Sequence, residues 1–363
     1  MRKKKAPDQQ TGANIQMMAE TLGVSIGTID RALHNRGRIS EKTRARVLQL
    51  AQELGYKPNL AARHLRLNRR FRVSVNLPFT IASFFDPLRT GVSEGARSFE
   101  HSLALEFRSY ERSDDELQTS VSNALDNQVD GIILAPSNTQ KTIRLMEQAK
   151  SKGVSIVCVA TDVPESSRLT AVTAHPFSCG AMSAEVIADS AHRPGSIAVL
   201  VGNIENYNQS EKLRGFRQTL AEFSPAHSFG PVLESRDIQE LAYKLTRTAF
   251  QRNKNLCGLY VSTANSMPAI RALQDIGKLS QVAIVTTDLF PELVPLLRDS
   301  IVRATIYQCP EMQGNIAAKA LFHYLADGTM PEPSIEVIPQ LILRSNLPLY
   351  IKTNPAMSAG NSP

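Results

Sequence analysis

The sequence has few of the features that mark exported, disulfide-bonded or membrane proteins. Among 363 residues there are four cysteines, which stand far apart without a Cys-x-x-Cys pair: Cys158, Cys179, Cys257 and Cys309. That spacing excludes a zinc ribbon and a disulfide scaffold. No apolar run approaches the ~18 residues of a membrane-spanning helix. Polar residues follow the basic start Met1–Lys5 where a signal peptide needs an apolar core, so we predict a cytoplasmic protein with no membrane contact.

Common catalytic and cofactor motifs are also absent. The sequence contains no Gly-x-Gly-x-x-Gly, Walker A or His-Glu-x-x-His pattern. Gly91-Val92-Ser93-Glu94-Gly95 matches a nucleophile elbow, but residues 86–90 before it predict a loop and a helix start, not the required strand. We interpret the match as chance inside a helix. His175 and Cys179 have the i, i+4 spacing of two metal ligands, but no third ligand accompanies them. We predict that the two side chains pack in the core. We therefore expect no catalytic residue, metal or cofactor.

Charge is unevenly distributed along the chain. Residues 1–72 contain 16 Lys and Arg against 5 Asp and Glu, whereas the remainder contains 25 against 29. The first segment thus carries +11 and the rest −4. Because most of the basic residues lie in or next to periodic segments, we interpret the excess as the electrostatic footprint of a polyanion-binding domain and not as a solvated tail.

The basic segment predicts three short helices after a flexible arm at 1–13. Residues 14–22 form the first helix, Ser25 caps a second that runs to about His34, and Ser40 caps a third that ends at Gly55. The inward positions expected on the third helix are Val47, Leu48, Ala51 and Leu54. A tight turn between the first two helices predicts a helix-turn-helix domain over 14–58, in preference to an ordinary three-helix bundle because of the charge. Residues 59–71 would be a hinge helix and linker, too short to be helical alone.

From residue 72 the pattern changes to short apolar runs alternating with helical segments. The predicted strands are 73–77, 103–107, 131–135, 154–159, 196–201, 258–261, 282–286 and 301–306. Strands alternating with helices indicate a parallel α/β sheet. Because the segment is too long for one sheet, we expect two lobes over 72–350 and a disordered tail at 351–363. Asp288 follows an apolar strand at the end where α/β sheets bind ligands. The alternative interpretation is a cap for the next helix.

Three motifs of the basic segment follow one another with a spacing that has no gaps from Asn14 through Leu65. They are Val24-Ser25-Ile26-Gly27-Thr28-Ile29-Asp30-Arg31-Ala32-Leu33, Ile39-Ser40-Glu41-Lys42-Thr43-Arg44 and Leu54-Gly55-Tyr56-Lys57-Pro58-Asn59. With these motifs the head resembles the LacI/GalR family of bacterial repressors. The body resembles the same family's effector domain and ribose-type periplasmic binding proteins, through Phe84-Phe85-Asp86-Pro87, Thr287-Asp288 and Gln308-Cys309-Pro310. The resemblance implies an all-α head on a two-lobed periplasmic-binding-protein-like body.

The resemblance also implies roles for individual residues. In the head, a recognition helix would enter the major groove with Ser25, Ile26, Gly27, Thr28 and Arg31, and Arg31 would read a guanine. Phosphates would be held by Asn14, Ser25, Tyr56 and Asn59, and Leu65 would wedge into the minor groove. In the body, Phe84 and Phe85 would stack on a sugar ring, and Asn265, Asp288 and Gln308 would bind its hydroxyls.

The pocket departs from that of ribose binders. The Asp-Arg pair of those proteins falls on Ala160-Thr161, with Asp162 next in line as a candidate ligand, and their Asp-Asn pair falls on His175-Pro176. We therefore expect a small sugar or polyol of undefined identity.

Together these observations predict a transcriptional regulator, a repressor by its resemblance. It would bind a pseudo-palindromic double-stranded operator as a homodimer or tetramer, because one head reads only a half-site. Two other classes share parts of the pattern. A periplasmic sugar-binding protein would have the same body fold. It would also have a signal peptide, and it would have no basic head. A sugar-modifying enzyme would place Asp288, Asp162 and Cys309 in a cleft, but no nucleophile–base pair supports it.

Overall fold

The computed structural model describes residues 15–33, 39–54, 70–111 and 114–353. The chain divides into two compact units, Met1–Asn68 and Arg69–Pro363. The described residues of the first unit are called the head and those of the second the body.

The head has three described helices around a small apolar core. They are α1 (Ile15–Leu22), α2 (Ile26–Leu33) and α3 (Glu41–Glu53). Met18, Ile29 and Val47, one from each helix, are completely buried. The predicted cap of α3 is confirmed, because the Ser40 hydroxyl accepts a hydrogen bond from the Thr43 main-chain N–H at 3.2 Å.

Two inward positions predicted on α3 are wrong. Leu48 is 44% exposed and Leu54, just beyond the helix, is 39% exposed. Ala51, which was predicted inward, and Leu50, which was not, pack against the core beside Val47. Only one side of α3 faces α1 and α2, so leucines outside that side remain on the surface.

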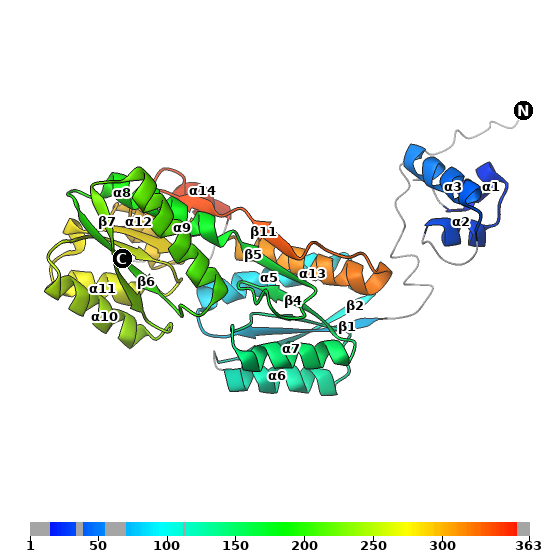
Figure 1. Ribbon diagram of the computed structural model, residues 1–363, viewed down its shortest axis with the longest axis horizontal. Helices are drawn as coiled ribbons and strands as arrows, with labels where there is room; N and C mark the ends of the chain where they lie inside the picture. The colour runs from blue at the N-terminus through cyan, green and yellow to red at the C-terminus, as the bar shows by residue number, and fades with distance from the viewer. Residues whose placement is uncertain (1–14, 34–38, 55–69, 112–113, 354–363) are drawn as a thin grey trace, which may run out of the picture. The chain divides into compact units, whose positions relative to one another are not determined.

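The described residues of the body form two six-stranded sheets, one in each of two lobes (Figure 1). In sheet order, the first lobe has β11 (Ser334–Val337), β5 (Thr170–Ala174), β4 (Ser155–Val159), β3 (Gly131–Leu134), β1 (Phe71–Pro78) and β2 (Leu103–Tyr110). The second has β12 (Gln340–Ile342), β10 (Ala304–Tyr307), β9 (Ala283–Thr287), β8 (Leu256–Val261), β6 (Gly195–Val201) and β7 (His227–Glu234). All neighbours are parallel except β10 and β12. The predicted two-lobed α/β fold is confirmed.

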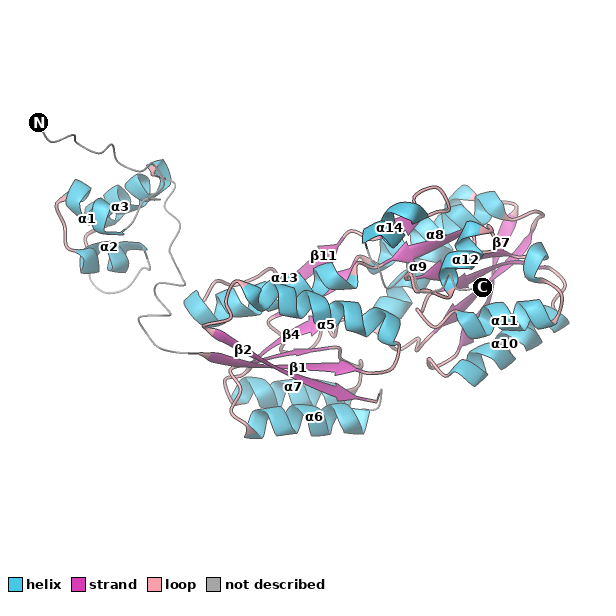
Figure 2. Cartoon of the chain, turned by 180° about the vertical axis from the view of Figure 1, so that it is seen from behind, coloured by secondary structure: helices cyan, strands magenta, loops and turns pink. Residues whose placement is uncertain are grey.

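Helices cover both faces of each sheet, as in Figure 2. In the first lobe α5 (Ala82–Arg97) and α13 (Pro310–Asp327) share one core, and α6 (Asp114–Asp126) and α7 (Gln140–Ser151) share another. In the second lobe one core contains α8 (Pro176–Ser190) and α9 (Tyr207–Phe223). The other contains α10 (Gln239–Arg252), α11 (Met267–Asp275), α12 (Leu293–Arg298) and the start of α14 (Leu347–Thr353), near a 3₁₀ turn at Leu279–Gln281. Because α14 continues to Thr353, the predicted disorder of residues 351–353 is wrong. None of the helices in the described ranges is both long and apolar enough to cross a membrane.

The apparent nucleophile elbow lies within α5, as predicted, but the expected loop at 86–90 is wrong. Phe84, Phe85 and Leu88 are buried on one face of α5, and this burial keeps the segment helical despite Pro87. A Cβ on Gly91 would overlap the carbonyl group of Glu311 on α13. The motif's first glycine therefore allows the two helices to pack closely.

The chain passes between the lobes three times within the part that the structure describes. The passages lie between β5 and α8, between β10 and α13, and between β11 and β12. At the second passage Cys309 adopts a left-handed backbone with φ 53°. Each lobe is therefore built from separated segments of the sequence, and the passages form a hinge.

Candidate functional site

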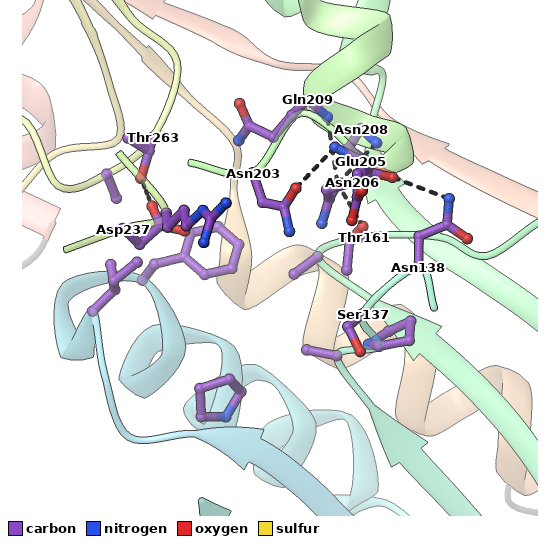
Figure 3. A pocket seen from close by; sticks show the side chains of 18 of the residues that line it. Ser137, Asn138, Thr161, Asn203, Glu205, Asn206, Asn208, Gln209, Asp237 and Thr263 are labelled. Carbon is purple, nitrogen blue, oxygen red and sulfur yellow. Dashed lines mark hydrogen bonds between the residues drawn. The ribbon is translucent and has the colours of Figure 1, made fainter. Parts of the chain in front are cut away.

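A pocket of about 560 Å³ lies between the two lobes of the body (Figure 3). Strands of both sheets point their carboxyl ends into it, and residues at or just after those ends include Pro78, Tyr110, Ala135, Ala160, Glu234, Ser262, Asp288 and Gln308. Ligands of α/β sheets bind at this edge. The volume is typical of a site for a small molecule.

Asp288 lies at the buried end of the pocket, directly after β9. Its Oδ1 accepts a hydrogen bond from the main-chain N–H of Gln308 at 3.0 Å, and its Oδ2 accepts one from Gln308 Nε2 at 2.6 Å. Burial raises the pKa of this carboxyl group to about 6, although the Gln308 hydrogen bonds and the charge of Lys212 oppose the rise. Since α12 begins only after Glu292, Asp288 does not cap the next helix.

Lys212 completes this polar cluster from α9. Its side chain is buried, with 3% of the residue exposed. The ammonium donates to Gln308 Oε1 at 2.8 Å and to the Ser262 carbonyl oxygen at 3.1 Å. An ammonium has three donors, so the contacts found among the described residues leave one for a ligand. Lys212, Gln308 and Asp288 therefore present both donors and acceptors at one end of the pocket.

The first lobe contributes an aromatic surface to the same pocket. Phe84 and Phe85, in the first turn of α5, are 6% and 5% exposed. Their ring centroids are 5.2 Å apart in an edge-to-face arrangement. Both belong to the core of the lobe and both line the pocket, so their positions are fixed by packing.

A second polar wall follows β7. Arg236 and Asp237 both adopt left-handed backbone conformations, with φ 51° and 57°. The Thr263 hydroxyl donates to Asp237 Oδ1 at 2.6 Å (Figure 3). Arg236 is exposed and lines the pocket beside Asp237. This wall adds a cation and a carboxylate near the open side.

Two predicted ligand residues do not line the pocket. The Asp162 carboxylate binds the guanidinium of Arg168, with Nη2 at 2.6 Å from Oδ2, inside the first lobe. Thr161, one residue earlier, lines the pocket instead. Asn265 donates from Nδ2 to the Asp237 carbonyl oxygen at 3.1 Å and supports the wall from behind. The structure thus brings together Phe84, Phe85, Asp288 and Gln308 of the six predicted residues.

The sequence analysis missed several polar lining residues: Asp114, Thr161, Asn206, Asn208, Gln209, Lys212, Arg236 and Asp237. Lys212 had a usable signal. It lies on the buried stripe of α9 beside Leu213 and Phe216, and a lysine on an apolar helix face needs a polar partner. Asp114, Asn208 and Gln209 stand in the first turns of α6 and α9, and the remaining residues come from loops. Because these elements belong to both lobes, no local pattern in the sequence predicts that they line one pocket.

In the head, the described residues that the resemblance assigns to the major groove lie on α2 or directly before it. Ser25, Ile26, Gly27 and Arg31 are exposed and Thr28 is partly exposed, whereas Ile29 and Ala32 of the same segment are buried. The N–H of Thr28 donates to Ser25 Oγ at 3.2 Å, and Arg31 Nε donates to the Gly27 carbonyl oxygen at 3.0 Å. The other predicted contacts, Asn14, Tyr56, Asn59 and Leu65, lie outside the described residues.

Comparison with protein families identifies both parts. The model of bacterial regulatory proteins of the lacI family matches residues 14–59, and a periplasmic binding protein domain matches residues 73–329. The chain belongs to the lacI family of bacterial regulatory proteins. Its helix-turn-helix head is joined to a periplasmic-binding-protein-like body, as the sequence resemblance predicts.

Curated relatives of this LacI-family protein are transcriptional regulators. Catabolite control protein A of Priestia megaterium is 25% identical over 262 residues, covering 72% of this chain and 77% of the relative. The transcriptional repressor PurR of Pasteurella multocida is 22% identical over 346 residues, covering 92% and 98%. The chain is thus a DNA-binding transcriptional regulator.

Solved structures confirm the fold of the body. The glucose-galactose binding protein GanP of Geobacillus stearothermophilus has a TM-score of 0.71 at 18% identity, covering 77% of this chain and all of that one. A solute binding protein of Agrobacterium vitis has a TM-score of 0.72 at 16% identity, covering 80% and 98%. This LacI-family regulator therefore carries a sugar-binding-protein fold as its effector domain.

Proposed function

We propose that the protein is a repressor whose operator binding is controlled by a small polyhydroxylated effector in the interlobe pocket. The main support for this proposal is that a buried polar cluster and two aromatic rings line the same pocket. The cluster consists of Asp288, Gln308 and Lys212, and the rings are those of Phe84 and Phe85. Sugar and polyol rings have apolar faces that pack on aromatic side chains. Their hydroxyl groups need donors and acceptors at fixed positions, because an unpaired buried hydroxyl is costly.

The structural relatives support this effector class. The solute binding protein of Agrobacterium vitis is described as bound with alpha-D-tagatopyranose, and another from Bacillus halodurans with myo-inositol. The fold is therefore compatible with a cyclic sugar or polyol between the lobes, and we assign this class to the present pocket.

For the head, we propose that Ser25, Ile26, Gly27, Thr28 and Arg31 enter the major groove. Arg31 is exposed and its guanidinium is well suited to the edge of a guanine. The family resemblance assigns phosphate contacts to Asn14, Ser25, Tyr56 and Asn59 and a minor-groove contact to Leu65. It also assigns the hinge to residues 59–71. A pseudo-palindromic operator requires two heads, so we propose a homodimer or a higher assembly of dimers, acting in the cytoplasm where the chromosome lies.

A single titration series tests this proposal. The full-length protein is titrated with DNA from upstream of its own gene, measured by fluorescence anisotropy, with and without each member of a sugar and polyol panel. We expect specific binding that weakens steeply with salt, because the head neutralises phosphates, and one panel member that changes the affinity. A salt-independent affinity would contradict DNA binding, and a response to no sugar or polyol at millimolar concentration would contradict the effector class.

A further inference from the structure

A second hollow lies in the second lobe, at the amino ends of strands whose carboxyl ends form the interlobe pocket. Its volume is about 570 Å³, and it is bounded by residues just before β6, β8 and β9 and by the ends of α10 and α11, which lie side by side in Figure 1. It shares no lining residue with the interlobe pocket. A ligand in this hollow would therefore not compete with the effector.

The charged groups around this hollow are mostly basic. Arg193, Arg247, Lys254 and Lys278 line it, and Asp275 is the acidic residue among the described lining residues. Four cations against one carboxylate give a local charge of +3. The chain after residue 72, by contrast, contains 25 Lys and Arg against 29 Asp and Glu. A local excess that is opposite in sign to the rest of the body attracts anions.

Two of the cations are held in place by main-chain carbonyl groups. Arg193 Nη2 donates to the carbonyl oxygens of Lys254 at 2.7 Å and of Leu256 at 2.9 Å. Lys278 Nζ donates to the carbonyl oxygen of Phe250, near the end of α10, at 2.5 Å. A guanidinium has five N–H donors and an ammonium three, so the contacts found among the described residues leave donors on both cations. The fold therefore fixes two positive charges at the wall of the hollow before any ligand binds.

The other two cations have no such structural task. Arg247 Nη1 donates to the Tyr243 hydroxyl at 3.2 Å, and this hydroxyl donates to Asp275 Oδ2 at 2.7 Å. Lys254 is exposed. In the part of the chain that the structure describes, neither cation forms an ion pair with a carboxylate. Support of the backbone accounts for Arg193 and Lys278, but it does not account for Arg247 and Lys254.

We propose that this hollow is a second ligand site of the regulator, which binds a small molecule that carries phosphate groups. Guanidinium groups bind phosphate oxygens through parallel N–H groups, and the two lysines add compact charges. The volume is that of a small-molecule site. The cations surround one hollow, whereas a duplex binds basic residues that extend along a face. This inference does not depend on the interlobe effector or on operator binding.

The test uses the absence of tryptophan from the chain. Gln251→Trp places a single tryptophan at the exposed edge of the hollow in the full-length protein, so its fluorescence reports on this site and not on the basic head. Pyrophosphate is the probe, added at constant ionic strength without sugar or DNA. We expect a saturable change in fluorescence. Gln281→Trp, which also lines the hollow, should report the same affinity.

Variants in the Gln251→Trp chain assign the binding to the hollow. Arg247→Gln combined with Lys254→Gln should lower the affinity for pyrophosphate at least about tenfold, because charge-assisted hydrogen bonds are lost. Asp275→Asn should raise the affinity, since it removes a carboxylate that repels the probe. Lys244→Gln is the matched control. It removes one charge from the exposed face of α10 outside the hollow and should change the affinity less than about twofold.

Four results would overturn the proposal. The first is a fluorescence that millimolar pyrophosphate leaves unchanged, and the second is an equal response when sodium chloride replaces pyrophosphate. The third is an unchanged affinity in the double variant. The fourth is displacement of pyrophosphate by a short duplex of unrelated sequence, which would assign the surface to nucleic-acid phosphates. If the double variant unfolds, Lys254→Gln alone decides, because the Lys254 ammonium makes no hydrogen bond within the described ranges.

Discussion

The two lobes contribute different chemistry to one pocket. The first lobe provides rings, Phe84 and Phe85, that belong to its own core. The second provides most of the charged groups, including Lys212, Asp237 and Asp288. A ligand with apolar faces and many hydroxyl groups needs both surfaces at once. This difference indicates that neither lobe is a binding site alone. Occupancy of the pocket by an effector is therefore coupled to the angle between the lobes.

Substitution of an aromatic residue should affect folding most. Phe84→Ala removes a ring that is 6% exposed, and we expect the free energy of unfolding to fall by about 3–5 kcal/mol because a cavity remains in the core. Urea unfolding followed by circular dichroism measures this. Ile204→Ala is the control, since Ile204 lines the same pocket but is 42% exposed. Equal losses for both variants would show that the ring is not part of the core.

Substitution of the buried carboxylate should affect binding instead. Asp288→Ala removes the acceptor for effector hydroxyl groups, and each unpaired hydroxyl costs about 1–3 kcal/mol. We expect normal operator binding without sugar and a response shifted at least tenfold in sugar concentration. The measurement is a pair of operator titrations, with and without the sugar that shifts the parent protein.

The alternative outcomes for Asp288 are distinct. An unchanged sugar response would remove Asp288 from the site. Loss of operator binding in the absence of sugar would make its role structural. Asp288→Asn is the control for shape, because it preserves one acceptor oxygen and removes the charge.

Substitution of an exposed residue in the head should change DNA binding and leave the stability of both lobes unaffected. We expect Arg31→Ala to cost about 1–3 kcal/mol at the specific operator and to relax base preference at one position in each half-site. A panel of operators with single base changes measures this. Arg46→Ala, on the exposed face of α3, is the control for charge alone. An equal loss on every sequence would indicate that Arg31 contacts phosphate and no base.

Lowering the pH should give the smallest of these effects. It should weaken effector binding and at the same time stabilise the folded protein. Burial raises the pKa of Asp288 to about 6. As pH falls from 7 to 5 the carboxylate becomes protonated and loses acceptor capacity, so effector affinity should fall by at most about tenfold. The unliganded protein should gain stability over the same window, because a folded-state pKa above the unfolded value favours the folded state at low pH.

Comparison of the parent chain with Asp288→Asn isolates this contribution. The difference between their thermal midpoints should shrink as pH falls through about 6, since both side chains are then neutral. A difference that stays constant between pH 7 and 5 would contradict the assignment of the titration to Asp288.

Much of the fold follows from local patterns, and the exceptions have physical causes. Bulky apolar runs such as 131–135 and 282–286 predict strands that the structure contains. Strand β5, Thr-Ala-Val-Thr-Ala, has small and polar residues, and β7 contains Gly230 and Pro231, so neither has the pattern of a buried strand. Strands β11 and β12 are short and depend on partners remote in sequence.

The site was predictable where a strand end or the family resemblance marks it, as at Asp288, Gln308, Phe84 and Phe85. Asp162 was assigned one position too far along the chain. Ala160 has a left-handed backbone, with φ 67°, and the turn that follows directs Thr161 to the pocket and Asp162 to Arg168. A shift of one residue reverses which side chain faces a ligand, and sequence alone does not resolve such a turn.

The repeated passage of the chain between the lobes has a consequence for its synthesis. Helix α13 and strand β11 are encoded after the whole run from α8 to β10, yet both complete the first lobe. During translation the ribosome therefore releases most of the second lobe while the first still lacks a covering helix and an edge strand. The lobe that emerges first is completed late, and a nascent chain that stalls near residue 300 would expose the surface of α5 that Glu311 and its helix later cover.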